Sequence, residues 1–446
     1  MAKLLKINHS HHILFSMLWI ILLFLINPSF SFASHQNITL VYSGNLDGEL
    51  EPCGCSEGGN KGGIKRRATM IDSLRKETPD LFLLSAGGLI TSEVAQDKLK
   101  SEYILKGLKA LDYDAIGVQW QDLSFGPTFL RDSELPFVLS NNENAYFFQK
   151  RTINNGKIKL LFVNWLNPKR APQQKIRKEF SSSSFIAITA ALKSAKENNQ
   201  ITVLSTTLPL QVARKTFSFE NIDILIIKAK YEKIGDPQKV ENTLVIQPGS
   251  RGMRLGKLIL NVDHHGNIDK WTHQIYPLPP DVADSPRMKT WYDNYNAEVK
   301  KDYEKRVAIR KNLESGASTF AGAHACQSCH IAEYKAWNSS KHADAFYALQ
   351  DVNKAFDPDC IICHTVGFDQ KGGFIEPSIT ENLMHVQCEN CHGEAKAHSQ
   401  APTNASTKNA GWTKIQMCAQ CHIQKHSPTF NLDKYWEKIS HGKVKK

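Results

Sequence analysis

One short motif, Cys-x-x-Cys-His, occurs four times in the last third of the chain. In this motif two thiols bond covalently to one haem, and the adjacent histidine supplies the proximal ligand of the iron. A pair of zinc sites would use the thiols but would leave four identically placed histidines unexplained. We therefore predict four covalently attached haem c groups. The attachment residues are Cys326, Cys329, Cys360, Cys363, Cys388, Cys391, Cys418 and Cys421, and the proximal ligands are His330, His364, His392 and His422.

The region from 319 to 446 is also rich in further histidines and poor in apolar sequence. Ten of the 17 histidines lie between His324 and His441. Removing the four proximal ligands leaves His324, His342, His385, His398, His426 and His441. A second histidine on each iron would give an electron carrier, whereas an open position would allow small-molecule chemistry. Four haems would supply the apolar volume that this region lacks, so we expect folding and cofactor attachment to be coupled.

The N-terminus has the layout of a secretory signal. Lys3 and Lys6 precede an apolar run from Ile13 to Ile26, and the small-residue stretch Ser31-Phe32-Ala33 follows. This pattern predicts a signal peptide over residues 1–33. An uncleaved membrane anchor is the alternative, although the run is short for a full span. We expect an exported protein in the periplasm, where c-type haem is found, with the outer membrane or cell exterior as alternatives.

Composition excludes one class of partner. The 446 residues carry a formal charge of +11, but the basic residues are dispersed and lack interleaved aromatics, so no nucleic-acid surface is expected. Eight haem propionates would offset much of this charge.

Residues 34–284 alternate apolar runs with amphipathic stretches, which indicates an α/β layered fold with a mixed sheet. The expected strands are Ile38–Tyr42, Leu81–Leu84, Ala115–Val118, Ile158–Val163, Ile201–Leu204, Ile222–Ile227, Leu244–Ile246 and Leu255–Val262. The expected helices are Gly63–Lys76, Leu99–Leu111 and Ser184–Asn198.

The order of motifs in this region resembles the calcineurin-like metallophosphatase domain of periplasmic 5′-nucleotidases. The matching stretches are Ser43–Pro52, Gly62–Thr69, Leu83–Gly88, Phe125-Gly126, Gln247–Ser250 and Leu255–Leu258. The family holds two metals with Asp, His and Asn side chains. Here the corresponding positions are Asn45 and Asp47, Gly88, Trp120-Gln121-Asp122, Thr206, Ala229 and Tyr231. Two-metal hydrolysis needs bridging carboxylates and imidazoles, so hydrolase activity is not expected.

Cys53 and Cys55 lie in a glycine-rich loop that follows the first expected strand. In an oxidising compartment they would form a strained, reducible disulfide. A metal site and two packed thiols are the alternatives, and the sequence does not decide among the three.

A charged stretch connects the two regions, over about residues 285–318. Between Ser285 and Glu314 it lacks glycine and places Trp291, Tyr295, Val299 and Tyr303 at helical spacing. We expect one long helix whose aromatic stripe packs against one or both domains.

The C-terminal region resembles the cytochrome c-554 family of tetrahaem cytochromes. The matching features include Ser340–Phe346, Gly372-Gly373-Phe374, Val386–Gly393 and Tyr435-Trp436. The resemblance implies a mostly helical, loop-rich multihaem domain with His342, His398 and His441 as distal ligands. It also implies one five-coordinate iron, at the second motif, which His385 or His324 would otherwise cap.

The sequence thus predicts an electron-transfer protein that accepts electrons from one redox partner and passes them to another. The degenerate α/β domain would dock a partner or orient the haems. The alternative is an oxidoreductase that reduces a small nitrogen compound at a five-coordinate haem. A subunit of a membrane-associated complex or of a filament is a third setting, which the sequence neither favours nor excludes.

Overall fold

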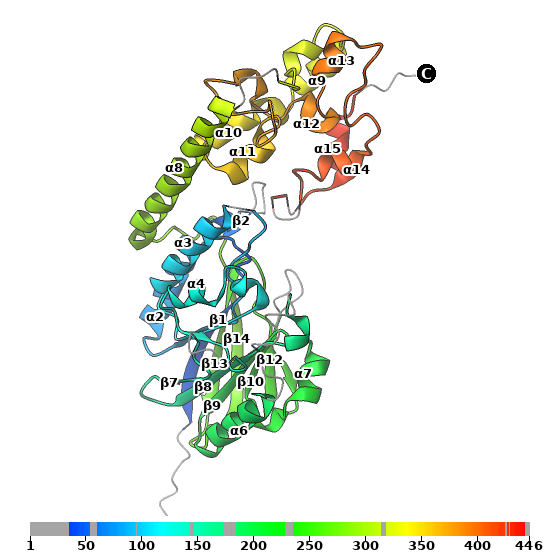
Figure 1. Cartoon of the computed structure of the whole chain (residues 1–446). Helices are drawn as coiled ribbons and strands as arrows, with labels where there is room; N and C mark the ends of the chain where they lie inside the picture. The colour runs from blue at the N-terminus through cyan, green and yellow to red at the C-terminus, as the bar shows by residue number, and fades with distance from the viewer. Residues whose placement is uncertain are drawn as a thin grey trace, which may run out of the picture.

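The computed structural model describes residues 35–53, 60–94, 96–142, 147–172, 180, 184–227, 235–313, 318–423, 426–427 and 429–441. The predicted signal peptide, the side chains of Cys53 and Cys55, and Ala229 and Tyr231 lie outside this part of the chain. An α/β body and a loop-rich helical body lie at opposite ends, and one long helix, α8, runs beside the second (Figure 1).

Two six-stranded sheets form the α/β body. The first has the order β14-β13-β1-β4-β5-β6, in which β1 is antiparallel to β13 and parallel to β4. Its strands are β1 (Gln36–Ser43), β4 (Phe82–Ser85), β5 (Ala115–Gly117), β6 (Phe137–Val138), β13 (Arg254–Val262) and β14 (Ile268–Pro277).

The second sheet has the order β11-β12-β10-β9-β8-β7. Its strands are β7 (Arg151–Asn154), β8 (Lys159–Trp165), β9 (Ile201–Thr206), β10 (Ile224–Ile227), β11 (Gln238–Val240) and β12 (Thr243–Ile246). A two-stranded hairpin, β2 (Pro52–Cys53) and β3 (Lys61–Gly62), completes the strands.

The two sheets pack face to face between layers of helices. Alternate residues of a strand point to opposite faces, so Leu40 and Phe162 lie in the core between the sheets. Val41 points the other way, toward α2 (Ile64–Glu77) and α3 (Asp97–Lys109). On the far side, α6 (Ser184–Glu197) and α7 (Leu210–Thr216) cover the second sheet. The predicted α/β class with mixed sheets is therefore confirmed.

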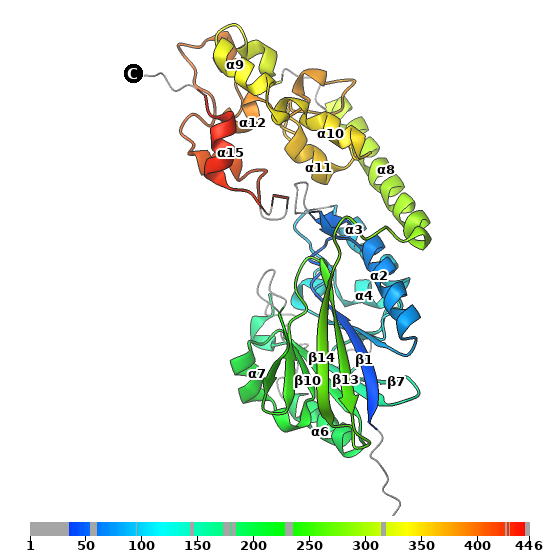
Figure 2. The same ribbon diagram turned by 180° about the vertical axis from the view of Figure 1, so that it is seen from behind.

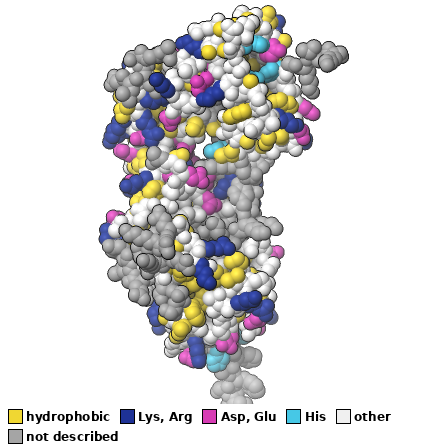
Figure 3. Space-filling model, turned by 45° about the vertical axis from the view of Figure 1, so that its right-hand side comes forward, with side chains coloured by type: hydrophobic (Ala, Val, Ile, Leu, Met, Phe, Trp, Pro, Cys, Tyr) yellow, Lys and Arg dark blue, Asp and Glu magenta, His cyan; other side chains and the backbone are white. Residues whose placement is uncertain are grey.

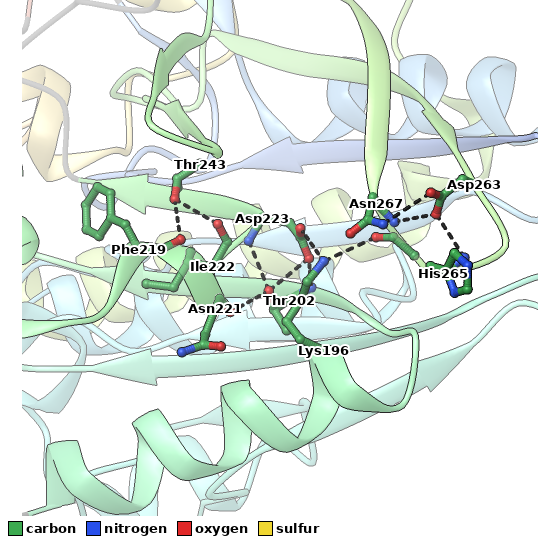
Figure 4. A network of polar contacts seen from close by, with 11 residues as sticks. Lys196, Thr202, Phe219, Asn221, Ile222, Asp223, Thr243, Asp263, His265 and Asn267 are labelled. Carbon is green, nitrogen blue, oxygen red and sulfur yellow. Dashed lines mark hydrogen bonds and ion pairs between the residues drawn. The ribbon is translucent and has the colours of Figure 1, made fainter.

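A polar network ties the layers together beside α6 (Figure 4). The Nζ of Lys196 lies 2.8 Å from Oδ1 of Asp223 and 3.4 Å from the carbonyl oxygen of Gly266, in the β13–β14 turn. Oδ2 of Asp223 accepts hydrogen bonds from the backbone amide and the hydroxyl of Thr202 on β9. Asp263 closes the turn by accepting from the amides of His265 and Asn267. These contacts are structural, and they lie at the end of the body away from α8 (Figure 1).

The long helix α8 (Lys289–Leu313) belongs to the cores of both bodies. Tyr295 and Val299 pack with the helices of the first sheet. Two turns later, Tyr303 packs in the core of the C-terminal body. The side chain of Trp291 donates a hydrogen bond to the carbonyl oxygen of Tyr103 on α3. The predicted packing of the aromatic stripe is confirmed, because one helix face is buried against two partners in succession.

Short helices and loops make up the C-terminal body (Figures 1 and 2). The helices are α9 (Ile331–Asn338), α10 (Ala345–Asp351), α11 (Pro358–His364), α12 (Cys388–His392), α13 (Lys396–Gln400), α14 (Lys414–Cys418) and α15 (Leu432–Ile439). A small core around Phe346 and Phe374 is its main apolar cluster. Over the described residues, we find no helix whose length and apolar character would let it span a membrane.

Candidate haem centres

The four motifs sit on or beside short helices of the C-terminal body. The second motif ends α11 and the third makes up α12, while the first and fourth follow single helical turns. A helical turn brings residues three apart to the same side, so the two thiols of a motif face one partner. Their side chains are exposed or half-buried, and none of these eight cysteines is in a disulfide. The arrangement leaves each thiol pair accessible for attachment.

Three proximal histidines each face another histidine from a distant part of the chain. The ring centroids of His330 and His398 lie 6.3 Å apart. The corresponding distances are 6.2 Å for His342 and His422 and 5.9 Å for His392 and His441. An iron between two imidazoles needs two metal–nitrogen bonds of about 2 Å plus part of each ring, which adds up to about 6 Å between centroids. The spacing of all three pairs fits a bis-histidine iron.

The orientation of several rings also fits metal binding. The Nδ1 atoms of His364, His398 and His441 donate hydrogen bonds to backbone carbonyl oxygens, at 2.5, 2.8 and 2.8 Å. A ring that carries its proton on Nδ1 presents the lone pair of Nε2, and metal-binding histidines are commonly held in this way. The acceptors are Ala345, Ala405 and Ile439.

Burial keeps most of these imidazoles in the neutral form that binds a metal. It lowers the pKa of His364 and His422, and it is the main reason for the low pKa of His342 and His392. The charge of the paired histidine adds to this effect at His342 and His392, since two close imidazoles resist double protonation.

His364 differs from the other three proximal histidines. Among the described residues, no histidine ring is paired with it at a spacing of about 6 Å. After burial and the charge of His422, the charge of His364 also lowers the pKa of the nearby His342, whose ring faces His422 instead. His385 instead accepts a hydrogen bond at Nδ1 from the amide of Phe346. Its ring lies edge-on to that of Tyr347, with the two ring centroids 4.6 Å apart. His324 pairs with the hydroxyl of Tyr334 at 3.1 Å. Neither of the two candidates for the fourth distal position is therefore brought to a proximal histidine.

Thiols of different motifs are neighbours. Cys326 and Cys388 are hydrogen-bond partners, and this contact lowers the pKa of the Cys326 thiol to about 7. Cys363 and Cys421 are partners in the same way, and Cys391 and Cys418 are close enough to interact electrostatically. The first motif therefore adjoins the third, the third adjoins the fourth, and the fourth adjoins the second.

Large apolar side chains lie exposed on the surface around the motifs. Figure 3 shows hydrophobic side chains and several histidines together on the C-terminal body, in the upper part of the view. Large apolar side chains that are more than a third exposed include Ile331, Tyr347, Ile362, Trp412, Ile415 and Ile423. Flat apolar groups on the four motifs would cover such a surface, so the residues present fit haem.

In the α/β body, the positions that would hold metals are taken up by hydrogen bonds. Oδ1 of Asn45 accepts from the side chain of Gln119 at 2.7 Å, and Oδ1 of Asp47 accepts from Gln121 at 3.3 Å. Asp122 is fully buried and accepts from the backbone amides of Gly88, Leu89 and Gln119. Burial raises the pKa of this carboxyl although the amides oppose the shift. No group of three or more His, Cys, Asp or Glu side chains suited to a metal occurs in the described part of the chain.

Gln119 is the residue that the sequence reasoning missed. It caps the turn after β5 and reaches Asn45, which follows β1 two strands away in the sheet, a contact that depends on side-chain reach and not on a motif. Its place directly after a buried strand, next to Trp120, was the available signal.

Comparison with known proteins agrees with this geometry. A family model described as cytochrome c554 and c-prime matches residues 325–393. This region is similar to the cytochrome c554 and c-prime family. Cytochrome c-554 of Nitrosomonas europaea is 36% identical over 92 residues, which cover 17% of this chain and 39% of that protein. Domains of this family carry covalently bound haem c and are usually extracytoplasmic. The fourth motif, Cys418–His422, follows the matched range.

The α/β body has the fold of 5′-nucleotidases and related enzymes. A candidate 5′-nucleotidase of Staphylococcus aureus, solved with alpha-ketoglutarate, aligns with a TM-score of 0.50 at 14% identity over 78% of this chain and 72% of that one. The sulfate thiohydrolase SoxB of Thermus thermophilus aligns with a TM-score of 0.51 at 12% identity, over 60% and 62% of the two chains. At these identities the likeness shows the fold alone.

Proposed function

We propose that this chain is an exported tetrahaem cytochrome that transfers electrons between two redox partner proteins. The observation that carries the proposal is the set of three histidine pairs spaced at about 6 Å, each combining a proximal histidine with one from elsewhere in the chain. Bound haem supplies one-electron chemistry at its iron, with a potential set by its axial ligands and surroundings. The protein holds the four groups in a fixed array.

The ligand assignment follows from the pairs. His398 is the distal partner of His330, His342 that of His422, and His441 that of His392. Only three of the four proximal histidines have such a partner among the described residues, so a haem held by His364 would keep one open axial position. Attachment uses the eight motif cysteines, giving four haems per chain.

We propose the spatial order first, third, fourth and second for the attached haems. Neighbouring thiols from different motifs support this order, because haems attached there would lie close to one another. Residues 319–446 act as the haem domain, 285–318 as the connector, and 34–284 as a domain for docking or orientation. We expect a periplasmic location after removal of residues 1–33.

An absorption and EPR spectrum of the holoprotein, with and without carbon monoxide, tests this function. Three low-spin haems and one high-spin haem that binds carbon monoxide are expected for four haems per chain. Fewer than four haems would refute the tetrahaem assignment, and four low-spin haems without a carbon monoxide response would refute the open position at His364.

A second candidate is reduction of a small nitrogen compound at the second motif. The observation that favours it is the absence of a histidine partner for His364 among the described residues. The test is reduction of nitrite or hydroxylamine with a reduced dye as electron source. Turnover that carbon monoxide inhibits would support an enzyme, and its absence in a fully haem-loaded protein would leave electron transfer.

A further inference from the structure

The helix that carries the second motif begins at the contact between the two bodies. Its N-cap, Asp357, accepts a hydrogen bond from the side chain of Gln96 at 3.3 Å, and the next carboxylate, Asp359, pairs with Lys100 at 2.6 Å. Gln96 and Lys100 belong to α3 and its N-cap in the α/β body. In both views α3 and β2 are the parts of this body nearest the C-terminal body (Figures 1 and 2).

A second cation extends the contact. Lys354, which precedes α11, lies 2.8 Å from Glu51 of the α/β body, 2.8 Å from Asn296 on α8 and 3.4 Å from Asp357. The hydroxyl of Tyr292 on α8 also donates to Glu51. The docking cluster, defined as Glu51, Lys100, Lys354, Asp357 and Asp359, thus joins both bodies and the helix between them.

The two cations of the docking cluster are largely removed from water. Lys100 and Lys354 are both 7% exposed, and Asp357 is 3% exposed. Burial by itself would lower the pKa of Lys100, but the charges of Asp359, Glu49 and Asp357 outweigh it and raise the pKa above its ordinary value. The same balance, with Glu51 and Asp357 as the main charges, raises the pKa of Lys354. Both lysines therefore stay charged beside α11.

We propose that the α/β domain sets the reduction potential of the haem at the second motif through this cluster, with Lys100 as the principal positioning residue. The inference rests on the proposed attachment at Cys360 and Cys363, which directly follow Asp359. It gives the degenerate α/β domain a specific task, which is to hold a fixed, partly buried charge pattern against one of four haems.

The sign of each effect follows from charge. Oxidised haem carries one more positive charge than reduced haem, so a nearby cation favours the reduced form and a nearby anion favours the oxidised form. Removing Lys100 leaves Asp359 without this partner and lowers the potential, whereas neutralising Asp359 raises it. At an effective dielectric constant of about 20, a unit charge about 12 Å from the iron changes the equilibrium about tenfold. For one electron this is about 59 mV.

Spectroscopic redox titration of the full-length holoprotein tests the inference in four variants. Lys100→Met lowers the equilibrium constant for reduction of the carbon monoxide-binding haem about tenfold, so its potential falls. Asp359→Asn raises this equilibrium constant by a similar factor. The double variant returns close to the wild-type value, because both charges of the pair are gone. The control is Lys109→Met on the same helix, whose amine pairs with Glu134 at an exposed site and whose removal leaves the potential unchanged.

The outcomes separate this inference from the function on which it rests. Opposite shifts in the single variants, with cancellation in the double variant, support electrostatic tuning. Unchanged potentials, or shifts of the same sign in both single variants, overturn it, because a purely structural role has no reason to follow charge. A wild-type protein without haem at the second motif contradicts both proposals, whereas a fully loaded protein with unmoved potentials contradicts the tuning alone.

Discussion

The two bodies of this molecule reach stability in different ways. The α/β body closes its own core: the faces of two sheets meet through residues such as Leu40, Phe82 and Phe162, and the side chains of Asn45 and Gln119 bond to each other. The C-terminal body has one small core and leaves large apolar side chains exposed beside its motifs. A protein surface of this kind indicates a missing apolar partner, which the proposed haems provide. We therefore expect the C-terminal body to depend on bound haem for its stability, whereas the α/β body closes its own core.

The largest expected effect is that blocking haem attachment unfolds the C-terminal body and leaves the α/β body folded. In a host that lacks the attachment machinery, residues 319–446 should fail to fold stably, because about 130 residues with so little core cannot offset their conformational entropy. The α/β body should remain folded. Limited proteolysis followed by mass spectrometry measures this, with the holoprotein as control. A C-terminal body equally resistant in both forms would contradict its dependence on haem.

A substitution in the core of the α/β body should destabilise that body and leave the C-terminal body unaffected. Phe162 is fully buried between the sheets, so Phe162→Ala should lower the free energy of unfolding of the α/β body by about 3–5 kcal/mol. Phe185→Ala, at an exposed position on α6, is the matched control and should cost far less. In denaturation, hydrogen exchange of the strand amides reports on the α/β body and haem absorbance reports on the C-terminal body. If both signals shifted together, the bodies would unfold as one unit.

The same contrast explains what could be predicted from the sequence. Strands β8, β9 and β10 are buried along almost their whole length because both sheet faces are covered, so each contains an apolar run and all three were predicted. The edge strand β14 was missed, because it is half-exposed and mixes Trp271, His273 and Gln274 with few apolar residues.

At the candidate site, the residue types were predictable but the partners were not. The covalent motif fixes each proximal histidine locally. The pairing of His342 with His422, or of His330 with His398, depends on how distant segments fold together. The docking cluster escaped prediction for the same reason, since Lys100 and Asp359 are 259 positions apart and neither belongs to a motif.

Removing one distal histidine should change one haem and leave the α/β body untouched. His398→Ala exposes the iron at His330, so the number of haems that bind carbon monoxide should rise from one to two, with a new high-spin EPR signal. His324→Ala is the control, because that ring contacts Tyr334 and no proximal histidine among the described residues. A new carbon monoxide-binding haem in the control would reassign the fourth distal position to His324.

The smallest expected effect is around Asn45, Asp47 and Asp122, where added metal should not bind or produce activity. The side-chain oxygens of these residues already accept hydrogen bonds, Asn45 from Gln119, Asp47 from Gln121 and Asp122 from backbone amides. A divalent ion would have to break these hydrogen bonds to bind. Buried acceptors without partners cost about 1–3 kcal/mol each, which opposes such a rearrangement. We expect phosphodiesterase activity of the holoprotein with millimolar manganese to equal that of buffer. Activity that depends on manganese and disappears in Asp47→Ala would instead make the α/β body a working hydrolase, and the contrast between a structural and a cofactor-bearing domain would fail.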